Sequence, residues 1–269
     1  MIILLSRSGQ TCNQLLSIAS AYVLGLEHNE EVLCPVIDEH LKEFFEFNRK
    51  NVNDKVKMCH SGFWEILRKM SGIYRKCAKK DEIFLRFNKE CRILLDWISF
   101  KEDEVFVEHL TEVRDFFKFK KNIVENCEGI LDSRVDEKKI CVGIHMRRGD
   151  YKNFQGGKWY YSDENYARWM KALVRNKEVQ FVLFSNETIN LSYFEEQGLN
   201  VIGMQGSAIE DLCCLSMCDY IMGPPSTYSW WAAMYGNKRR LILENRDTEY
   251  QWEDFKYLEE RVAEGKDEY

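Results

Sequence analysis

Residues 140–151 read Ile140-Cys141-Val142-Gly143-Ile144-His145-Met146-Arg147-Arg148-Gly149-Asp150-Tyr151. The first five are rich in apolar residues that favour extended structure, which predicts a short buried β-strand. A histidine, two arginines and an aspartate follow where that strand ends. Ligands of open α/β sheets bind beyond the carboxyl ends of the strands, and the forked donors of arginine suit phosphate oxygens. The stretch therefore predicts a site for a phosphorylated ligand, with a surface turn paired to acidic residues as the alternative.

The segments downstream alternate between apolar runs and amphipathic helices. This order is typical of the α/β class with a parallel, doubly wound sheet. Residues 151–161 contain two glycines and several aromatic side chains, which predicts a loop over the mouth of the site that offers contacts to a second substrate. The expected strands are residues 179–186, 200–203 and 220–222, and the expected helices begin at Ser162, run from Ile189 to Gln197, and begin near Asp211.

The upstream half predicts a second α/β lobe. With 269 residues the chain has room for one large domain or, as we favour, two of roughly 130 residues each. The polar segment 125–139 separates the halves, so the expected lobes are residues 1–130 and 131–269. The expected elements of the first lobe are strands at 1–7, 31–35 and 104–108, a helix with Leu15 to Leu26 on its apolar side, a short helix from Asp38 to Phe47, and helices within 48–100.

Composition limits the partners and the compartment. The net charge of −6 argues against a general nucleic-acid-binding surface. The ten cysteines are scattered through a chain large enough to need no disulfides, which predicts reduced thiols and a cytoplasmic location. The first residues are too short for a signal-peptide core, and no stretch approaches the roughly 20 apolar residues that span a bilayer. Any membrane contact is therefore expected to be peripheral.

Two loops could present backbone N–H groups to an anion. Residues 8–14 connect the first strand to a helix, where Thr11 is equally suited to be a simple helix cap. Ser226 and Thr227 follow the strand at 220–222 and the turn at Pro224-Pro225, and they open the next helix. Ser-Thr alone is commonly a helix cap. Two such loops together with the arginine pair favour a diphosphate cradle.

Several motifs of phosphate and metal chemistry are absent from the sequence. It contains no GxxxxGK[ST], no GxGxxG, no HExxH and no pair of aspartates two residues apart that would hold a metal-bound diphosphate. An enzyme without that metal must neutralise a departing diphosphate with cationic side chains and helix ends. We therefore expect no metal site and no bound cofactor.

Three motifs resemble those of one enzyme family. His145 to Tyr151 resembles the HxRRGDY signature of the α-1,2-fucosyltransferases of glycosyltransferase family 11, within a superfamily that includes α-1,6- and protein O-fucosyltransferases. Asp211 to Asp219 followed by Ser226 to Trp231 resembles the second signature, an aspartate-leucine helix and then STFSWW. Gly9 with Asn13-Gln14 resembles the opening GxGNQ, although three residues separate the glycine from the asparagine here.

The resemblance implies a GT-B fold of two Rossmann-like lobes with mostly parallel, doubly wound sheets. It places GDP-β-L-fucose on the second lobe and brings the acceptor sugar from the first. In that assignment His145 and Asp211 read the guanine, and Arg147 holds the β-phosphate and the glycosidic oxygen. Phosphate oxygens are bound by Ser226 and Thr227, and the opening loop adds donor contacts through Gly9 and Asn13.

Two residues of the first motif keep alternative roles. Arg148 either contacts the donor or braces the loop through an internal salt bridge. Asp150 is either the base that activates the acceptor hydroxyl or a partner of the arginines, and we favour the partner role.

The reaction implied is an inverting, metal-independent transfer of fucose, with an α-1,2 linkage to galactose as the expected product. The family context suggests a lipid-linked or surface polysaccharide precursor as acceptor, at the inner face of the membrane. Use of another GDP-sugar and an inactive sugar-nucleotide- or glycan-binding protein are the alternatives.

Overall fold

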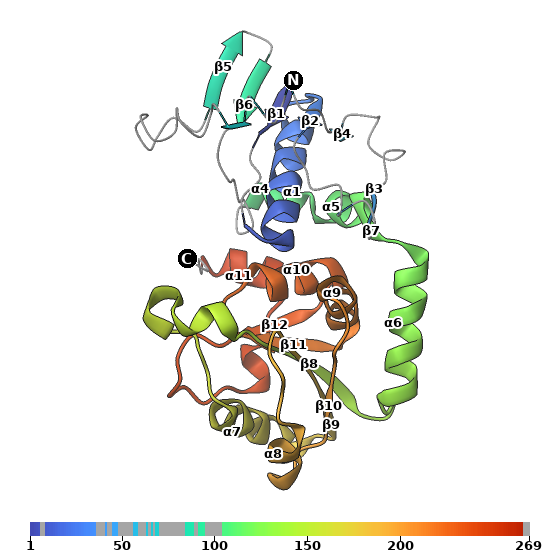
Figure 1. Ribbon diagram of the computed structural model, residues 1–269, viewed down its shortest axis with the longest axis vertical. Coiled ribbons are helices and arrows are strands. Elements are labelled where there is room, and N and C mark those ends of the chain that lie inside the picture. Colours follow the sequence, from blue (N-terminus) through green and yellow to red (C-terminus); the bar gives the residue numbers. More distant parts are fainter. Residues whose placement is uncertain are drawn as a thin grey trace. The chain divides into compact units, whose positions relative to one another are not determined.

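The computed structural model describes residues 1–5, 9–35, 41, 45–47, 56–58, 63, 66, 68–69, 84–88, 91–94 and 104–265 (Figure 1). The chain divides into two compact units, Met1–Lys120 and Lys121–Tyr269. The expected boundary at 130/131 falls inside helix α6 (Lys121–Arg134), which belongs to the second unit. There α6 packs on helix α9 (Ala208–Met217), and the buried Cys127 thiol donates to the Glu210 carbonyl at 3.4 Å.

The first unit is built on a five-stranded sheet in the order β4-β2-β1-β6-β5. Its strands are β1 (Ile2–Leu4), β2 (Val32–Cys34), β4 (Val56–Met58), β5 (Phe84–Asn88) and β6 (Cys91–Leu94). All neighbours are parallel except β5 and β6. Helix α1 (Thr11–Glu27) packs against β1 and β2, which confirms the strand–helix–strand order expected for the start of the chain.

The expected strand at 104–108 is wrong. These residues form helix α4 (Glu104–Glu108), which is followed by helix α5 (Leu110–Phe116). Phe106, Leu110 and Val113 are almost fully buried and recur at helical spacing, and both helices contact α1. The helical period over ten residues therefore prevails over the extended propensity of three consecutive apolar residues.

The helical expectations for residues 38–47 and 48–100 are also partly wrong. Phe45–Phe47 is strand β3, which pairs antiparallel with β7 (Phe117–Phe119). The range 48–100 contains β4, β5 and β6, because extended backbone there finds hydrogen-bond partners on the central strands. Most of the expected helical stripe lies outside the described residues, namely Trp64, Leu67, Met70, Ile73 and Tyr74.

The second unit has an all-parallel sheet in the order β10-β9-β8-β11-β12. The strands are β8 (Ile140–Met146), β9 (Val179–Ser185), β10 (Val201–Gly203), β11 (Tyr220–Gly223) and β12 (Arg239–Ile242). Four of these five were expected from the sequence, which confirms the α/β class with a parallel sheet. Helices α9 and α10 (Thr227–Gly236) cover one face, and α7 (Asp163–Leu173) and α8 (Leu191–Glu196) cover the other (Figure 1).

The two faces of β8 are packed differently. Val142, Ile144 and Met146 are fully buried on the side of α7, in one core cluster with Trp159 and Trp169. On the opposite side Gly143 leaves room for Leu215 and Cys218 from α9 and its C-terminal end. The central strand is therefore buried on both faces, as its continuous apolar run indicates.

The loop expected over the site is only partly at the surface. It begins with two short 3-10 turns, Gly149–Lys152 and Phe154–Gly157. Trp159 and Tyr161 then enter the core, and the Tyr161 hydroxyl donates to the Leu243 carbonyl at 2.6 Å. These two aromatic side chains are therefore structural, and Phe154 is the aromatic residue of this loop that stays exposed.

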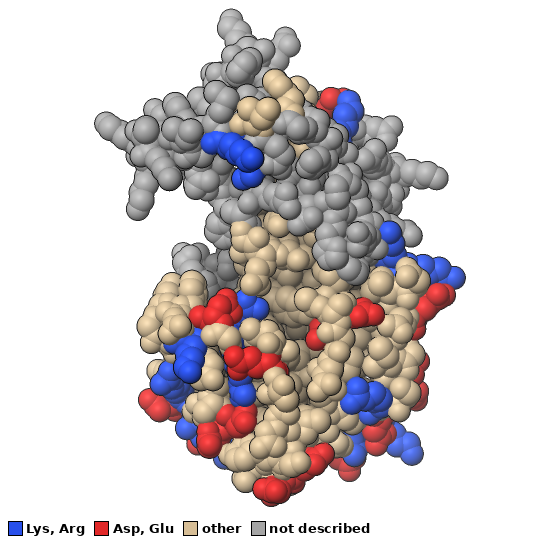
Figure 2. All heavy atoms as spheres, viewed as in Figure 1, with Lys and Arg blue, Asp and Glu red and all other residues tan. Residues whose placement is uncertain are grey.

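Three further features of the part of the chain that the structure describes are its charged surface, its cysteines and the length of its helices. Basic and acidic side chains of the second unit are interspersed on the face drawn in Figure 2. The cysteines whose side chains are described are buried free thiols, namely Cys12, Cys34, Cys127, Cys141, Cys213, Cys214 and Cys218. No helix within the described ranges is long and apolar enough to cross a membrane.

Two glycines of the second unit should respond to alanine with opposite signs. A Cβ on Gly143 would lie 2.6 Å from Leu215 Cδ1 and 2.9 Å from Cys218 Sγ, so Gly143→Ala should lower the free energy of unfolding by roughly 1–3 kcal/mol. A Cβ on Gly129 in α6 meets nothing within 4 Å, so Gly129→Ala should raise it by roughly 0.5–1 kcal/mol. Urea unfolding of both variants measures the difference, and equal effects would contradict the close packing of α9 on β8.

Candidate functional site

The carboxyl ends of β8, β9 and β11 meet at one edge of the sheet. In the parallel register Met146 pairs with Ser185, and Met222 pairs with Ile144. A Cβ on Gly223 would lie 2.8 Å from the His145 carbonyl oxygen, which shows how closely the ends of β8 and β11 approach. The polar residues that follow each strand are therefore neighbours in space, as the sequence predicts for 145–150 and 226–227.

His145 carries a buried, neutral imidazole and is the penultimate residue of β8. It is 5% exposed, and its ring centroid lies 4.9 Å from that of Tyr228. Burial, with the positive charges of Arg147 and Arg240, lowers the pKa of His145 to about 3. Its buried Nδ1 atom has no hydrogen-bond partner. This unpaired ring nitrogen is available to a ligand, since buried polar groups are nearly always satisfied.

Tyr228 connects His145 to the helix that carries Asp211. The Tyr228 hydroxyl donates to the carbonyl of Ala208, the first residue of α9, at 2.7 Å. Asp211 lies in the first turn of α9, is 8% exposed, and accepts the Gly206 N–H at 3.0 Å. Burial raises the pKa of Asp211 to about 6, although the Gly206 hydrogen bond opposes the shift. Its carboxyl therefore gains its charge at a higher pH than an ordinary aspartate.

Arg147 lies at the carboxyl end of β8 beside an exposed partner. Its Nη2 is 2.9 Å from Asp150 Oδ2, and the two side chains are 15% and 54% exposed. The Arg147 Cζ lies 5.6 Å from the centre of the Tyr151 ring. The Tyr151 hydroxyl donates to the Pro225 carbonyl at 2.6 Å, directly before Ser226. Tyr151 thus joins the arginine turn to the start of α10.

Ser226 is the N-cap of α10. Its Oγ accepts the N–H of Tyr228 at 3.2 Å, and Thr227 is the first helical residue. Arg240 Nη2 donates to the Ser226 carbonyl at 3.4 Å. The helix cap considered for this Ser-Thr pair is therefore confirmed, and binding of phosphate oxygens by Ser226 and Thr227 stays a prediction.

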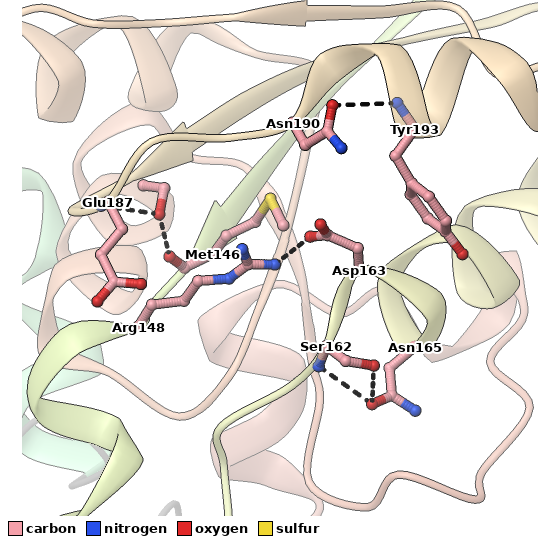
Figure 3. Close-up of polar contacts among 9 residues, drawn as sticks. Met146, Arg148, Ser162, Asp163, Asn165, Glu187, Asn190 and Tyr193 are labelled. Atoms are coloured by element: carbon pink, nitrogen blue, oxygen red, sulfur yellow. Dashed lines mark hydrogen bonds and ion pairs between the residues drawn. The ribbon is translucent and has the colours of Figure 1, made fainter.

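Arg148 has a different environment from Arg147. Its guanidinium forms an ion pair with Asp163, in the first turn of α7, and the two side chains are 11% and 23% exposed (Figure 3). Of the two roles considered for Arg148, the internal salt bridge is therefore present. The Arg148 N–H also donates to Asn186 Oδ1 at 2.8 Å, and the Gly149 N–H donates to Glu187 Oε1 at 3.1 Å.

These contacts form a frame around the arginine turn that the sequence did not reveal. Asp163 follows Ser162 at the start of an expected helix, and Asn186 is the last residue of the expected strand 179–186, but neither position by itself indicates a contact with the arginine turn. Gly149 has a φ of +55°, which only glycine adopts readily, and it lies against Asn186. Polar residues directly after a neighbouring parallel strand are the signal that could have identified Asn186 and Glu187.

The opening loop lies in the first unit. Gly9 has a φ of +76°, and a Cβ there would lie 2.8 Å from Asn13 Cβ. The N-cap of α1 is Gln10, so the alternative of a Thr11 cap is wrong. Gln14 Oε1 is buried without a hydrogen-bond partner. Donor contacts from Gly9 and Asn13 stay a prediction.

The partly buried Arg148–Asp163 pair should be coupled more strongly than an exposed pair on the same unit. Lys121 and Glu125 of α6 are 3.1 Å apart with side chains 85% and 58% exposed, which makes them a matched control. A double-mutant cycle to alanine should give a coupling of about 1–3 kcal/mol for Arg148–Asp163 and about 0.3–0.5 kcal/mol for Lys121–Glu125. Urea unfolding measures both cycles. Indistinguishable couplings would remove the bracing role of Asp163.

The fold of this chain is similar to the folds of several solved structures. NodZ fucosyltransferase from Bradyrhizobium matches with a TM-score of 0.60 at 16% identity, over 90% of this chain and 96% of that one. POFUT1 in complex with GDP-fucose matches with a TM-score of 0.56 at 7% identity, over 91% and 96%. At these identities the likeness establishes the fold.

The sequence itself gives the family. Galactoside alpha-(1,2)-fucosyltransferase 2 of Sus scrofa is 29% identical over 159 residues, which are 52% of this chain and 45% of that protein. Galactoside alpha-(1,2)-fucosyltransferase 1 of Rattus norvegicus is 27% identical over 158 residues, 52% and 41%. The match thus covers less than half the length of these relatives. The family model of Glycosyl transferase family 11 matches residues 86–263, and the chain belongs to this family.

Proposed function

We propose that this chain transfers L-fucose from GDP-β-L-fucose to a glycan hydroxyl, with galactose as the acceptor sugar and an α-1,2 linkage as the product. The names of the relatives and the GDP-fucose bound by a structural neighbour support this substrate pair. The observation that carries the proposal is the position of Arg147, at the carboxyl end of β8 between the buried His145 and the start of α10.

The base half of the donor fits the His145 and Asp211 side. Guanine presents an N1–H and an amino group along one edge, and a carboxylate accepts both. Asp211 is the buried carboxylate of this region, and the unpaired ring nitrogen of neutral His145 offers one further hydrogen bond. We therefore assign the guanine to this side, against the Tyr228 ring.

The diphosphate half fits Arg147 and the N-terminus of α10. Exchange of Asp150 for phosphate keeps the Arg147 charge paired, and the N-terminus of the ten-residue α10 adds positive potential beside Ser226 and Thr227. These groups supply the charge that a metal would otherwise bring, so we propose that transfer needs no metal.

The reaction is a single displacement. The acceptor hydroxyl oxygen bonds to C1 of fucose from the side opposite the diphosphate, the C1–O bond to the β-phosphate breaks, and its electron pair leaves with GDP. The hydroxyl proton passes to solvent water, and the β-linked donor gives an α-linked product. The Arg147–Asp150 ion pair supports the partner role for Asp150, which holds the guanidinium in place until the diphosphate replaces it.

We propose that the chain has the GT-B fold and that Gly9 and Asn13 contact the donor. A lipid-linked or surface polysaccharide precursor at the inner face of the membrane is the proposed natural acceptor. The test is incubation with GDP-fucose and lactose in excess EDTA, followed by linkage analysis. Transfer from GDP-mannose instead, or no hydrolysis of any donor, would contradict the proposal, and activity restored only by Mg²⁺ or Mn²⁺ would contradict its metal-free part.

Replacement of Arg147 should affect the chemical step more than donor binding. Negative charge grows on the β-phosphate as the fucosyl bond breaks, and lysine lacks the planar fork of arginine. Arg147→Lys and Arg147→Ala should each lower kcat by on the order of 100-fold or more, with a smaller loss of GDP affinity. Arg148→Ala, which releases Asp163 instead, is the matched control. A nearly unchanged kcat in folded Arg147→Ala would show that this arginine is structural.

Donor binding should weaken as the pH falls below about 6. If GDP-fucose requires charged Asp211, whose pKa is about 6, its Kd should rise roughly tenfold per pH unit below that value and level off above pH 7. His145, with its pKa of about 3, stays neutral throughout.

The raised pKa of Asp211 also affects the stability of the free protein. Because the ordinary Asp pKa is 3.8, the free energy of unfolding should fall as the pH rises from about 4 to about 6.

Calorimetric titration between pH 5 and 8 measures the effect on donor binding, and the diphosphate of GDP-fucose carries no group that titrates in this range. Asp211→Asn is the control, since it should bind weakly with a flat pH profile. An identical pH profile for the wild type and Asp211→Asn would exclude Asp211 from donor recognition.

A further inference from the structure

The second unit keeps one large hydrophobic side chain at its surface, beside the proposed reaction centre. Among the residues that the structure describes there, Phe154 is the only large hydrophobic one that is exposed, at 46%. Its ring stacks on that of Tyr151, with centroids 5.2 Å apart and planes 28° apart. Its centroid is 5.9 Å from that of Trp159, which is 3% exposed. We call Tyr151, Phe154 and Trp159 the aromatic shelf.

The backbone around Phe154 is held in an unfavourable conformation. Gln155, Gly156 and Gly157 have φ values of +46°, +70° and +76°, and the first of these is costly for a residue with a side chain. Arg246 fixes the end of this turn by donating to the Gly157 carbonyl at 2.8 Å. This left-handed turn leaves the Phe154 ring in water, whereas burial of the ring would stabilise the protein. The stability of the fold therefore does not account for the exposed position of Phe154.

The shelf is continuous with the catalytic arginine. Tyr151 contacts Phe154 through its ring, lies 5.6 Å from Arg147 Cζ, and is anchored through its hydroxyl to Pro225. Tyr151 therefore links Phe154 to the guanidinium that we place on the departing phosphate. Asp150, 54% exposed, and Lys158, whose Nζ lies 4.9 Å from the Trp159 ring centroid, add polar groups beside the shelf.

We propose that Phe154 is an acceptor-binding residue, whose exposed ring packs against a sugar ring of a β-galactoside. The C–H groups on one face of a pyranose form a flat apolar surface that matches an aromatic face, while the hydroxyls at its rim remain free for Asp150, Lys158 or water. The proposal rests on the fucosyl transfer proposed above, and it assigns the acceptor side of that same site to residues of the second unit.

The test separates acceptor binding from donor chemistry in the full-length chain. With lactose as acceptor, Phe154→Ala should raise the acceptor KM about tenfold, because one stacking contact is lost. The KM for GDP-fucose and the rate of donor hydrolysis without acceptor should not change. Phe154→Tyr and Phe154→Trp should retain the wild-type KM. Phe154→Leu keeps an apolar side chain but no flat face, so it should behave like Phe154→Ala.

Two outcomes would overturn the proposal. An unchanged lactose KM in Phe154→Ala would mean that the ring does not touch the acceptor, and full activity of Phe154→Leu would mean that it makes an apolar contact with protein instead. Saturation-transfer NMR of lactose with GDP-bound protein supplies a readout that needs no turnover. Loss of the lactose signal in Phe154→Ala would support acceptor binding by the aromatic shelf even if no transfer is detected. Transfer by Phe154→Ala with an unchanged lactose KM would contradict the role of Phe154 and leave the proposed fucosyl transfer intact.

Discussion

Every polar group of the site depends on the parallel pairing of β8 with β9 on one side and β11 on the other. Parallel strands end at the same edge, so the residues that directly follow β8, β9 and β11 meet there although they are distant in sequence. Close approach is possible because glycines stand at two narrow contacts: Gly143 under α9 and Gly223 beside His145. A side chain at Gly143 would push α9 away from β8, and one at Gly223 would push the ends of β8 and β11 apart.

Features of this arrangement that depend on residues close together in the sequence were predictable, and features that depend on tertiary packing were not. Strand β8 was predictable because a buried parallel strand is apolar on both faces, and the start of α10 because Pro-Pro and Ser-Thr punctuate the chain. Residues 104–108 were not, since three apolar residues fit a strand or a helix equally well. The partner of Arg148 was also beyond prediction, because Asp163 reaches it only through the packing of α7 on the sheet.

Burial shifts the pKa values of His145 and Asp211 in opposite directions. Desolvation disfavours the charged form of each, so it lowers the pKa of His145 to about 3 and raises that of Asp211 to about 6. The free protein thus holds a neutral imidazole with an unpaired Nδ1 and a carboxyl near its titration point. A ligand that donates hydrogen bonds to the Asp211 carboxylate would offset its desolvation, and a hydrogen bond to His145 Nδ1 would satisfy the unpaired ring nitrogen. For these two reasons we propose a guanine there.

The adjacent arginines differ in role because their partners differ in exposure. Asp150 is 54% exposed, so water would replace its lost hydrogen bonds in the proposed exchange of Asp150 for a phosphate, and that exchange would cost little. Asp163 is 23% exposed and Arg148 only 11%, so separating them would leave two poorly hydrated charges. The two adjacent arginines therefore differ: the Arg147 ion pair has a solvent-exposed partner, and the Arg148 ion pair is partly buried and holds the turn in place. The frame of Asn186 and Glu187 on the Arg148 and Gly149 amides then limits how far Arg147 can move during that exchange.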